Sequence, residues 1–111
     1  VVAYANEIKQ RELDVPPELI ERRGAVSAEV AVAMAEGARE RLGVDVAVSV
    51  TGVAGPGGGT EEKPVGLVHI HAVGPDGSLS VEFSVPSDRA TIRRRSAVAA
   101  LHLVRRLLSQ S

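Results

Sequence analysis

The residues best suited to chemistry lie in a glycine-rich stretch, residues 51–66, which directly follows a β-branched run at 44–50. Glycine and proline are too frequent there for a helix or a strand, and a loop at the end of a buried strand is where α/β folds bind ligands. Consecutive glycines let main-chain N–H groups point into one concavity, which suits phosphate or carboxylate oxygens. The stretch is therefore a candidate anion-binding loop, and a surface connection between two strands is the alternative.

Two common phosphate-binding loops do not fit this stretch. Lys63 is followed by Pro64 and a predicted strand, whereas the lysine of a P-loop is followed by Ser or Thr and a helix. The dinucleotide fingerprint also requires a helix after its glycines. Thr51, at the end of the strand, has the position from which α/β enzymes present side chains to ligands, and a structural role is the alternative.

A second candidate group lies near the start of the chain. Tyr4 ends the apolar residues 1–5, and Lys9 follows one helical turn after Asn6, so both side chains are expected at the sheet edge that carries the glycine-rich loop. A desolvated lysine can lose its proton and act as a base, and a tyrosine hydroxyl can donate or relay a proton. The alternative for Lys9 is a solvated helix lysine.

Other polar residues are weaker candidates. His69 and His71 share one strand face, but no third metal ligand is evident, so no metal site is expected. The arginines at 93–95 form a charge run of the kind that is usually a solvated helix face. Arg89 lies in the first turn of a predicted helix, whose N-terminus attracts anions, so it could assist a phosphate.

The composition narrows the function classes. The 111 residues form at most one domain, and 13 Lys and Arg against 14 Asp and Glu do not indicate a nucleic-acid surface. One Tyr, one Phe and no Trp argue against base stacking, and the absence of Cys removes disulfides and thiol nucleophiles. Without an apolar run of about 18 residues or a signal-peptide pattern, we expect a cytoplasmic protein with neither membrane nor nucleic-acid partners.

Periodicity and turn residues predict a layered α/β/α domain with a mixed sheet over residues 1–111. Strands are expected at residues 1–5, 44–50, 67–73 and 78–85, and helices at 7–13, 17–23, 28–42 and from about 88 to 109. The run 44–50 is expected to be a central strand. Ser27 and Ser87 are expected to cap the helices that follow them.

Helix packing and the chain start give two further expectations. An inward stripe on the helix at 28–42 is expected to let it lie close to the sheet, through Val30, Ala33, Met34, Gly37, Ala38 and Leu42. On the last helix the inward positions are expected to be Ile92, Ser96, Ala99, Ala100, Leu103, Leu107 and Leu108. The chain begins without Met, and the strand at 1–5 lacks a flanking element, so we expect an N-terminally incomplete domain.

Four collinear motifs resemble those of a known family. They are Tyr-Ala-Asn-Glu-Ile-Lys at 4–9, Gly-Ala-Val-Ser at 24–27, the stretch 50–66 with Val-Thr-Gly-Val-Ala-Gly-Pro-Gly-Gly-Gly-Thr and Glu-Lys-Pro-Val-Gly, and Ser-Asp-Arg at 87–89 with Arg93. Together they resemble the CinA C-terminal domain, the nicotinamide-nucleotide amidohydrolase family that is also called PncC.

The resemblance implies hydrolysis of nicotinamide mononucleotide to nicotinate mononucleotide and ammonia, in pyridine-nucleotide recycling, by a serine amidohydrolase. It implies that Lys9 is the base held neutral, that Tyr4 is the proton relay and that Arg89 meets the phosphate. The positions that match the substrate pocket are Thr51, Gly52, Gly55, Gly57, Gly58, Gly59 and Thr60. The family resembled needs no metal or cofactor and is typically homodimeric.

The chain departs from the family in one respect. The family's nucleophile lies in a Glu-Ser-Cys-Thr-Gly-Gly segment upstream of the Tyr/Lys motif, and these 111 residues contain no such segment. Two other interpretations stay open: a non-catalytic nucleotide- or phosphate-binding regulatory module, and a fold fragment whose exposed first strand pairs with another chain.

Overall fold

The computed structural model describes residues 9, 11, 13, 15–24, 26–53, 63, 65–85 and 87–109. Its elements are α2 (Pro17–Arg23), α3 (Ala28–Leu42), β1 (Ala47–Gly52), β2 (Leu67–Gly74), β3 (Gly77–Ser84) and α4 (Arg89–Ser109). Lys9, Arg11 and Leu13 also have helical conformation. The bounds of α2 and α3 are those predicted, whereas the predicted strand at 1–5 lies outside the described residues.

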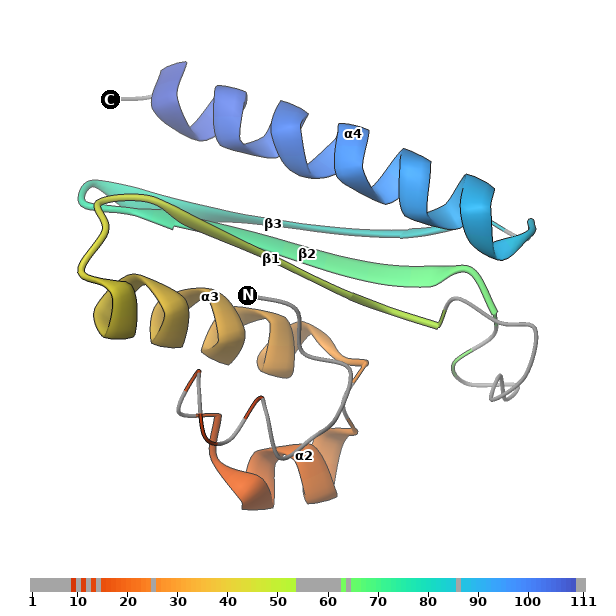
Figure 1. Cartoon of the computed structure of the whole chain (residues 1–111), viewed down its shortest axis with the longest axis horizontal. Coiled ribbons are helices and arrows are strands. Elements are labelled where there is room, and N and C mark those ends of the chain that lie inside the picture. Colours follow the sequence, from red (N-terminus) through yellow and green to blue (C-terminus); the bar gives the residue numbers. More distant parts are fainter. Residues whose placement is uncertain are drawn as a thin grey trace.

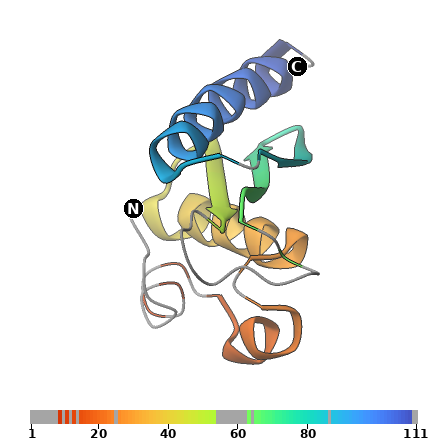
Figure 2. The ribbon, with the colours of Figure 1, turned by 90° about the vertical axis from the view of Figure 1, so that its right-hand side faces the viewer.

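The elements form layers around one sheet. The strands pair in the order β1-β2-β3, with α3 on one face and α4 on the other (Figure 1). α2 lies beyond α3, on the side away from the sheet, and Figure 2 shows the same succession of layers. The predicted α/β/α layering is confirmed. Both described strand pairs are antiparallel, and the remaining predicted strand, at 1–5, lies outside the described part.

Among the described strands β2 is central and β1 lies at one edge. The predicted strand at 1–5, which could flank β1, lies outside the described residues, so the central position of 44–50 stays a prediction. On β1, Ser49 and Thr51 are buried toward α3, whereas Val48 and Val50 are each 39% exposed on the α4 side. The reason is the position of α4, which packs mainly on β2 and β3 and leaves the valine face of β1 half covered. The small second face, which suggested a central strand, belongs to the side that lies under α3.

The main core joins one face of β2 to the inner face of α4. Its buried members repeat every second residue on the strand and every three to four on the helix, as these geometries require; they are Val68, Ile70, Ala72, Ile92, Ala100, Leu103 and Leu107. Ser96 is buried as predicted and Ala99 is partly buried against this core, whereas Leu108, which was also predicted to face inward, is 55% exposed. None of the described helices is long and apolar enough to cross a membrane.

α3 packs in two directions, which corrects the prediction that its inward stripe faces the sheet. Val30 and Met34 form a second core with three residues that precede α3, namely Leu13, Val15 and Ile20. On the sheet side, the carbonyl oxygen of Ala31 accepts a hydrogen bond from Ser49 Oγ at 2.5 Å. Leu42, the last member of the predicted stripe, is 59% exposed.

Gly37 marks the closest approach between α3 and the N-terminal segment. A Cβ at this position would lie 1.6 Å from the carbonyl oxygen of Leu13 and 2.7 Å from its carbonyl carbon. Both atoms belong to the backbone, so they cannot move aside as a flexible side chain could. Glycine is therefore required here for packing against Leu13, and not for packing against the sheet.

The helix ends are capped by local side chains. Ser27 caps α3 as predicted, since its Oγ accepts the Val30 N–H at 3.2 Å. α4 differs from the prediction, because Asp88 and not Ser87 is its N-cap: Asp88 Oδ1 accepts the Thr91 N–H at 2.7 Å. Serine and aspartate are both good caps, so adjacent residues of these types leave the choice to the geometry of the chain.

A polar layer separates the sheet from α3. His69 and His71 of β2 are buried on this face, where they lie opposite Thr51 and Ser49 of β1. His71 Nδ1 is 2.5 Å from Ser80 Oγ of β3. The sheet is thus apolar toward α4 and polar toward α3.

The environment of His71 disfavours the charged form of its imidazole. Its Nε2 is buried and has no hydrogen-bond partner among the described residues. Burial lowers the pKa of His71, and the negative charge of Glu36 on α3 offsets this only in part. The neutral imidazole is therefore favoured in the folded state.

We expect Gly37→Ala to destabilise the fold although alanine is the better helix former. Helix propensity alone would stabilise α3 by about 1 kcal/mol, whereas displacing the Leu13 backbone costs about 1–3 kcal/mol. Urea unfolding measures whether the substitution lowers or raises the unfolding free energy. Glu40 is exposed on the same helix, and Glu40→Ala should change the unfolding free energy by about 0.5 kcal/mol at most. A Gly37→Ala variant that is more stable than the parent would contradict the close approach.

Stability should fall as the pH drops below 6.5, the ordinary histidine pKa, because folded His71 binds its proton less readily than the unfolded chain does. The loss ends below the lowered folded-state pKa, and its slope is at most about 1.4 kcal/mol per pH unit. Unfolding free energies measured from pH 7 to 5 test this. His71→Gln should flatten the slope, and His102→Gln on exposed α4 should not; equal slopes in the parent and His71→Gln would refute the assignment.

Candidate functional site

The glycine-rich stretch leaves the sheet where β1 ends and β2 begins. The Val53 N–H donates to the Leu67 carbonyl at 2.9 Å, and the Gly66 N–H donates to the Val53 carbonyl at 2.6 Å. Gly66 has a φ of 98°, in the left-handed region that favours glycine. These bonds bring the two ends of the stretch together. Five predicted pocket residues lie outside the described part of the chain and stay predictions: Gly55, Gly57, Gly58, Gly59 and Thr60.

Thr51 and Gly52 stand at the base of this stretch. Thr51 is only 6% exposed and lies opposite His69, on the polar face of the sheet. Gly52 is exposed and pairs with Val68. Thr51 thus lies at the strand end predicted for it, with its side chain on the side of α3. Gly52, which was predicted in the loop, is instead the last residue of β1.

Lys9 is buried, with 7% of the residue exposed. Its segment packs against α3 through Leu13 and Val15, and its carbonyl accepts the Val15 N–H at 3.0 Å. Burial lowers the pKa of Lys9 below the usual 10.5, because the charged ammonium loses water. The alternative of a solvated helix lysine is therefore wrong. A lysine that sheds its proton more easily has the property that a general base needs.

Arg89 is the first residue of α4, and its side chain is exposed. α4 starts at the same end of the sheet as the glycine-rich stretch, because β3 ends there and the Val85 N–H donates to the Gly66 carbonyl (Figure 1). The Asp88 cap already occupies the helix N-terminus, and its hydrogen bond from the Thr91 N–H lowers the pKa of Asp88. An incoming phosphate would meet this carboxylate, so Arg89 would bind an anion through its guanidinium and not through the helix end.

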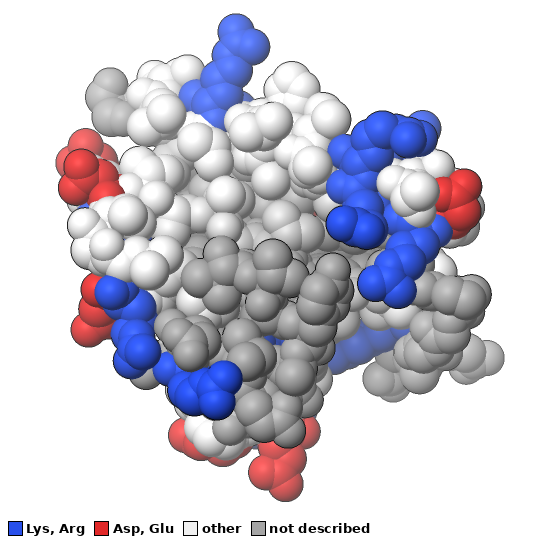
Figure 3. All heavy atoms as spheres, viewed as in Figure 1, with Lys and Arg blue, Asp and Glu red and all other residues white. Residues whose placement is uncertain are grey.

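The arginines that follow Arg89 strengthen the positive charge at this end. The side chains at 93–95 are all exposed on the first turns of α4. Figure 3 shows Lys and Arg side chains gathered at the end of the molecule where α4 begins. The charge run is thus solvated, as predicted, and it lies at the loop end of the sheet.

A cleft of about 210 Å³ lies between the start of α3 and strands β2 and β3. It is lined by Ala28, Ala31, His69, Ile70, Ser80, Val81 and Glu82. The Nε2 of His69 lies 4.0 Å from Glu82 Oε1. Within the described ranges no group of three or more His, Cys, Asp or Glu residues could hold a metal ion. The pattern of alternating residues on β2 could have located His69 on this face, but not the cleft.

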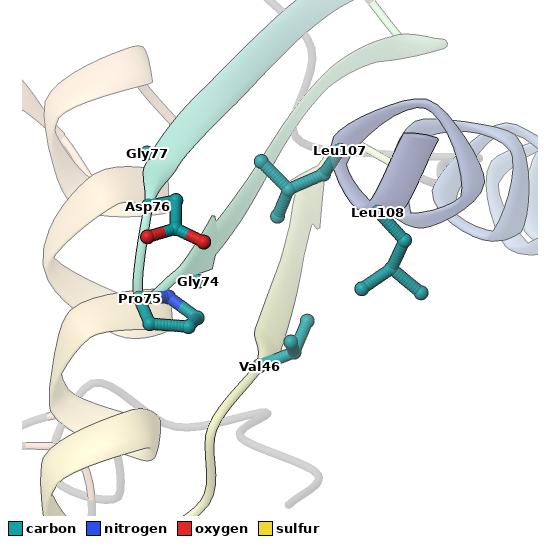
Figure 4. Close-up of a pocket in the computed structure, with 7 residues that line it drawn as sticks. All are labelled: Val46, Gly74, Pro75, Asp76, Gly77, Leu107 and Leu108. Atoms are coloured by element: carbon teal, nitrogen blue, oxygen red, sulfur yellow. The ribbon is translucent and has the colours of Figure 1, made fainter. Parts of the chain in front are cut away.

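The opposite end of the sheet holds a smaller cavity, of about 40 Å³ (Figure 4). The hairpin turn from Gly74 to Gly77 meets Leu107 and Leu108 of α4 there, with Val46 beside them. This volume has room for about one water molecule, so it cannot hold a nucleotide.

The predicted site residues fall into two groups in the structure. Thr51, Gly52 and Arg89 lie at one end of the sheet, whereas Lys9 lies in the segment that packs on α3 from the side of α2 (Figure 1). Their convergence stays a prediction, because Tyr4 and residues 54–62 lie outside the described residues. Sequence reasoning also passed over Lys63, whose contact with α2 no local pattern indicates.

Comparison with known proteins places the chain among relatives. Residues 1–108 match the family model described as the CinA C-terminal domain. A CinA-like protein of Parasynechococcus marenigrum (strain WH8102) is 54% identical over 114 residues, which cover 100% of this chain and 27% of that protein. A CinA-like protein of Mycolicibacterium paratuberculosis is 53% identical over 116 residues, with the same coverage of 100% and 27%. The chain thus spans about a quarter of these relatives.

Solved structures of CinA-type proteins are also similar to this chain. The competence/damage inducible protein of Agrobacterium tumefaciens superposes with a TM-score of 0.92 at 42% identity, over 96% of this chain and 66% of that one. A competence-damaged protein (CinA) superfamily member from Escherichia coli gives a TM-score of 0.88 at 31% identity, over 94% of this chain and 60% of that one. The chain belongs to the CinA C-terminal domain family.

Proposed function

We propose that this chain supplies the base and the substrate pocket of a CinA-family domain that hydrolyses the carboxamide of nicotinamide mononucleotide, which yields nicotinate mononucleotide and ammonia. The observation that carries the proposal is the buried Lys9 with its lowered pKa. Amide hydrolysis through a covalent intermediate needs a nucleophile that has lost its proton, and a neutral lysine can accept this proton. The motif resemblance supports the choice of substrate, and the activity fits a cytoplasmic homodimer that recycles pyridine nucleotides.

In the proposed reaction Lys9 takes the hydroxyl proton of a serine, and the serine oxygen attacks the carboxamide carbon. Tyr4 relays this proton from Lys9 to the leaving nitrogen, and ammonia departs. Water then attacks the acyl carbon, which releases nicotinate mononucleotide and returns a proton to the serine oxygen. Ser27 and Ser49 are unsuited to the attack, since Ser27 caps α3 and Ser49 donates to the Ala31 carbonyl. On the motif resemblance, the attacking serine is assigned to a Glu-Ser-Cys-Thr-Gly-Gly segment, which these 111 residues do not contain.

The anionic end of the substrate is assigned to the loop end of the sheet. Arg89 and the arginines at 93–95 supply positive charge there, next to the base of the glycine-rich stretch. A mononucleotide would thus place its phosphate by α4 and its pyridine ring toward the polar face that carries Thr51.

A non-catalytic nucleotide-binding module is the second candidate. The lack of a Glu-Ser-Cys-Thr-Gly-Gly segment favours it for the 111 residues taken alone. Both candidates predict mononucleotide binding, and they differ only in turnover.

Calorimetric titration with nicotinamide mononucleotide, followed by an ammonia assay, tests the proposal on the 111-residue chain. We expect binding without ammonia release, because the base is present and the attacking serine is not. Ammonia release by this chain would show that the nucleophile lies within it. Absence of binding would remove both candidates.

Lys9→Met should slow catalysis strongly without unfolding the domain. In a protein that joins this chain to its serine segment, we expect a loss of about 10²–10⁴-fold in kcat, the usual contribution of a general base. In the parent, kcat should rise with pH through the lowered Lys9 pKa, because only the neutral amine accepts a proton. Burying methionine costs less than burying an ammonium, so Lys9→Met should be at least as stable in urea. Retained activity in Lys9→Met would exclude Lys9 as the base.

Arg89→Gln should weaken mononucleotide binding by about tenfold or more, the cost of losing one hydrogen bond to a charged group. Nicotinamide riboside lacks the phosphate, so the variant should bind this analogue as tightly as the parent does. Arg105→Gln, near the other end of α4, is the matched control and should leave both affinities unchanged. An equal loss for the riboside would contradict the phosphate assignment.

A further inference from the structure

The Glu-Lys-Pro-Val-Gly motif at 62–66 takes no part in the proposed reaction, yet its lysine makes a specific contact. Lys63 Nζ donates a hydrogen bond to the carbonyl oxygen of Arg23 at 2.5 Å. Lys63 lies toward the end of the glycine-rich stretch, and Arg23 is the last residue of α2. The bond joins segments that are 40 residues apart in the chain.

The acceptor is well suited to a cation. The last carbonyls of a helix have no intrahelical N–H partners, and they carry the negative end of the helix dipole. An ammonium group at this position gains both a hydrogen bond and a favourable charge interaction, so the bond is stronger than one between neutral groups. Arg22 and Arg23 point to the same preference for positive charge in the last turn of α2.

Gly24 makes room for the ammonium. It follows Arg23 directly and has a φ of 83°, in the region that favours glycine. A Cβ at this position would lie 2.4 Å from Lys63 Nζ and 3.7 Å from its Cε. The Gly24 position and the lysine thus fit each other sterically.

The turn that receives Lys63 is held on both sides. The Gly24 N–H donates to the Ile20 carbonyl at 2.8 Å, and Ser27 Oγ donates to the Gly24 carbonyl at 3.0 Å. Ile20 belongs to the second core together with Leu13, in the segment that also contains Lys9. The ammonium therefore rests on a part of the chain that is fixed relative to Lys9.

The other anchor of the glycine-rich stretch is the sheet, through Val53 and Gly66. The bonds at Val53 and Gly66 join the two ends of the stretch to the sheet, whereas the Lys63 bond joins its end to the last residue of α2. We propose that Lys63 is a positioning residue, which holds the end of the glycine-rich stretch against the turn between α2 and α3 and so sets its place relative to Lys9. The ligand arm of the test rests on the proposed function, whereas the contact itself does not.

Amide hydrogen exchange without ligand tests the contact. In Lys63→Met we expect the Gly24 amide to exchange about tenfold faster, the effect of losing one hydrogen bond to a charged group at the end of α2. Lys63→Arg keeps a charged donor and should largely restore the parent rate. Arg22→Met removes a positive charge from the same exposed helix end and is the matched control, with an unchanged rate.

Gly24→Ala provides a reciprocal variant. Its Cβ occupies the place of the ammonium, so it should accelerate exchange by itself, and adding Lys63→Met should then have little further effect. Additive effects of the two substitutions would overturn the contact.

Calorimetric titration with nicotinamide mononucleotide tests the positioning role. Affinity should fall about tenfold in Lys63→Met, and it should stay near the parent value in Lys63→Arg and Arg22→Met. Unchanged exchange in Lys63→Met would overturn the contact, and faster exchange with unchanged affinity would overturn the positioning role. If the parent does not bind the mononucleotide, the proposed function fails, while the exchange rates still decide whether Lys63 holds the turn.

Discussion

The fold depends on how closely α3 approaches the layers on either side of it. At Gly37 the Leu13 backbone comes so near that no side chain fits, and at Ala31 the helix carbonyl accepts a hydrogen bond from the sheet. Small residues at both contacts allow one helix to pack against the N-terminal segment on one side and against the polar face of the sheet on the other. Any displacement of α3 would therefore move the N-terminal segment and the polar face of the sheet together.

This arrangement accounts for the environment of Lys9. The segment that carries it packs with Val30 and Met34 of α3, so its side chain is taken out of water. Desolvation opposes the ammonium form, which costs stability and at the same time lowers the pKa toward the range of a useful base. A residue that weakens the fold and prepares for proton transfer is typical of functional sites, where activity and stability compete.

The sequence predicts the ends of α2 and α3, because local geometry determines them. Pro17, Ser27 and Gly43 delimit α2 and α3 because a first-turn proline, a serine N-cap and a left-handed glycine act within a few residues. Exposure of Leu42 and Val48 could not be predicted in this way, because it depends on which layer covers each face.

In the candidate site, too, the features set by local geometry could be predicted, whereas those set by contacts between distant segments could not. Thr51 could be placed at a strand end from the chain order, and Arg89 in the first turn of a helix. The burial of Lys9 and the bond between Lys63 and Arg23 depend on contacts between distant segments, for which the sequence carries no periodic signal. The cap of α4 was also mispredicted by one residue, because Ser87 and Asp88 are both good caps and only the backbone geometry selects Asp88.

The two faces of the sheet have a consequence for how the domain opens. Toward α4 it is held by a continuous apolar core, whereas toward α3 it presents hydroxyls and imidazoles. Apolar burial supplies most of the free energy that resists local unfolding, so these halves form cooperative units of unequal strength. We therefore expect the sheet with α4 to resist opening longer than α3 does, together with the residues that pack on it, Leu13, Val15 and Ile20. In that case opening on the α3 side would expose the buried Lys9 to water while the strand end with Thr51 keeps its place in the sheet.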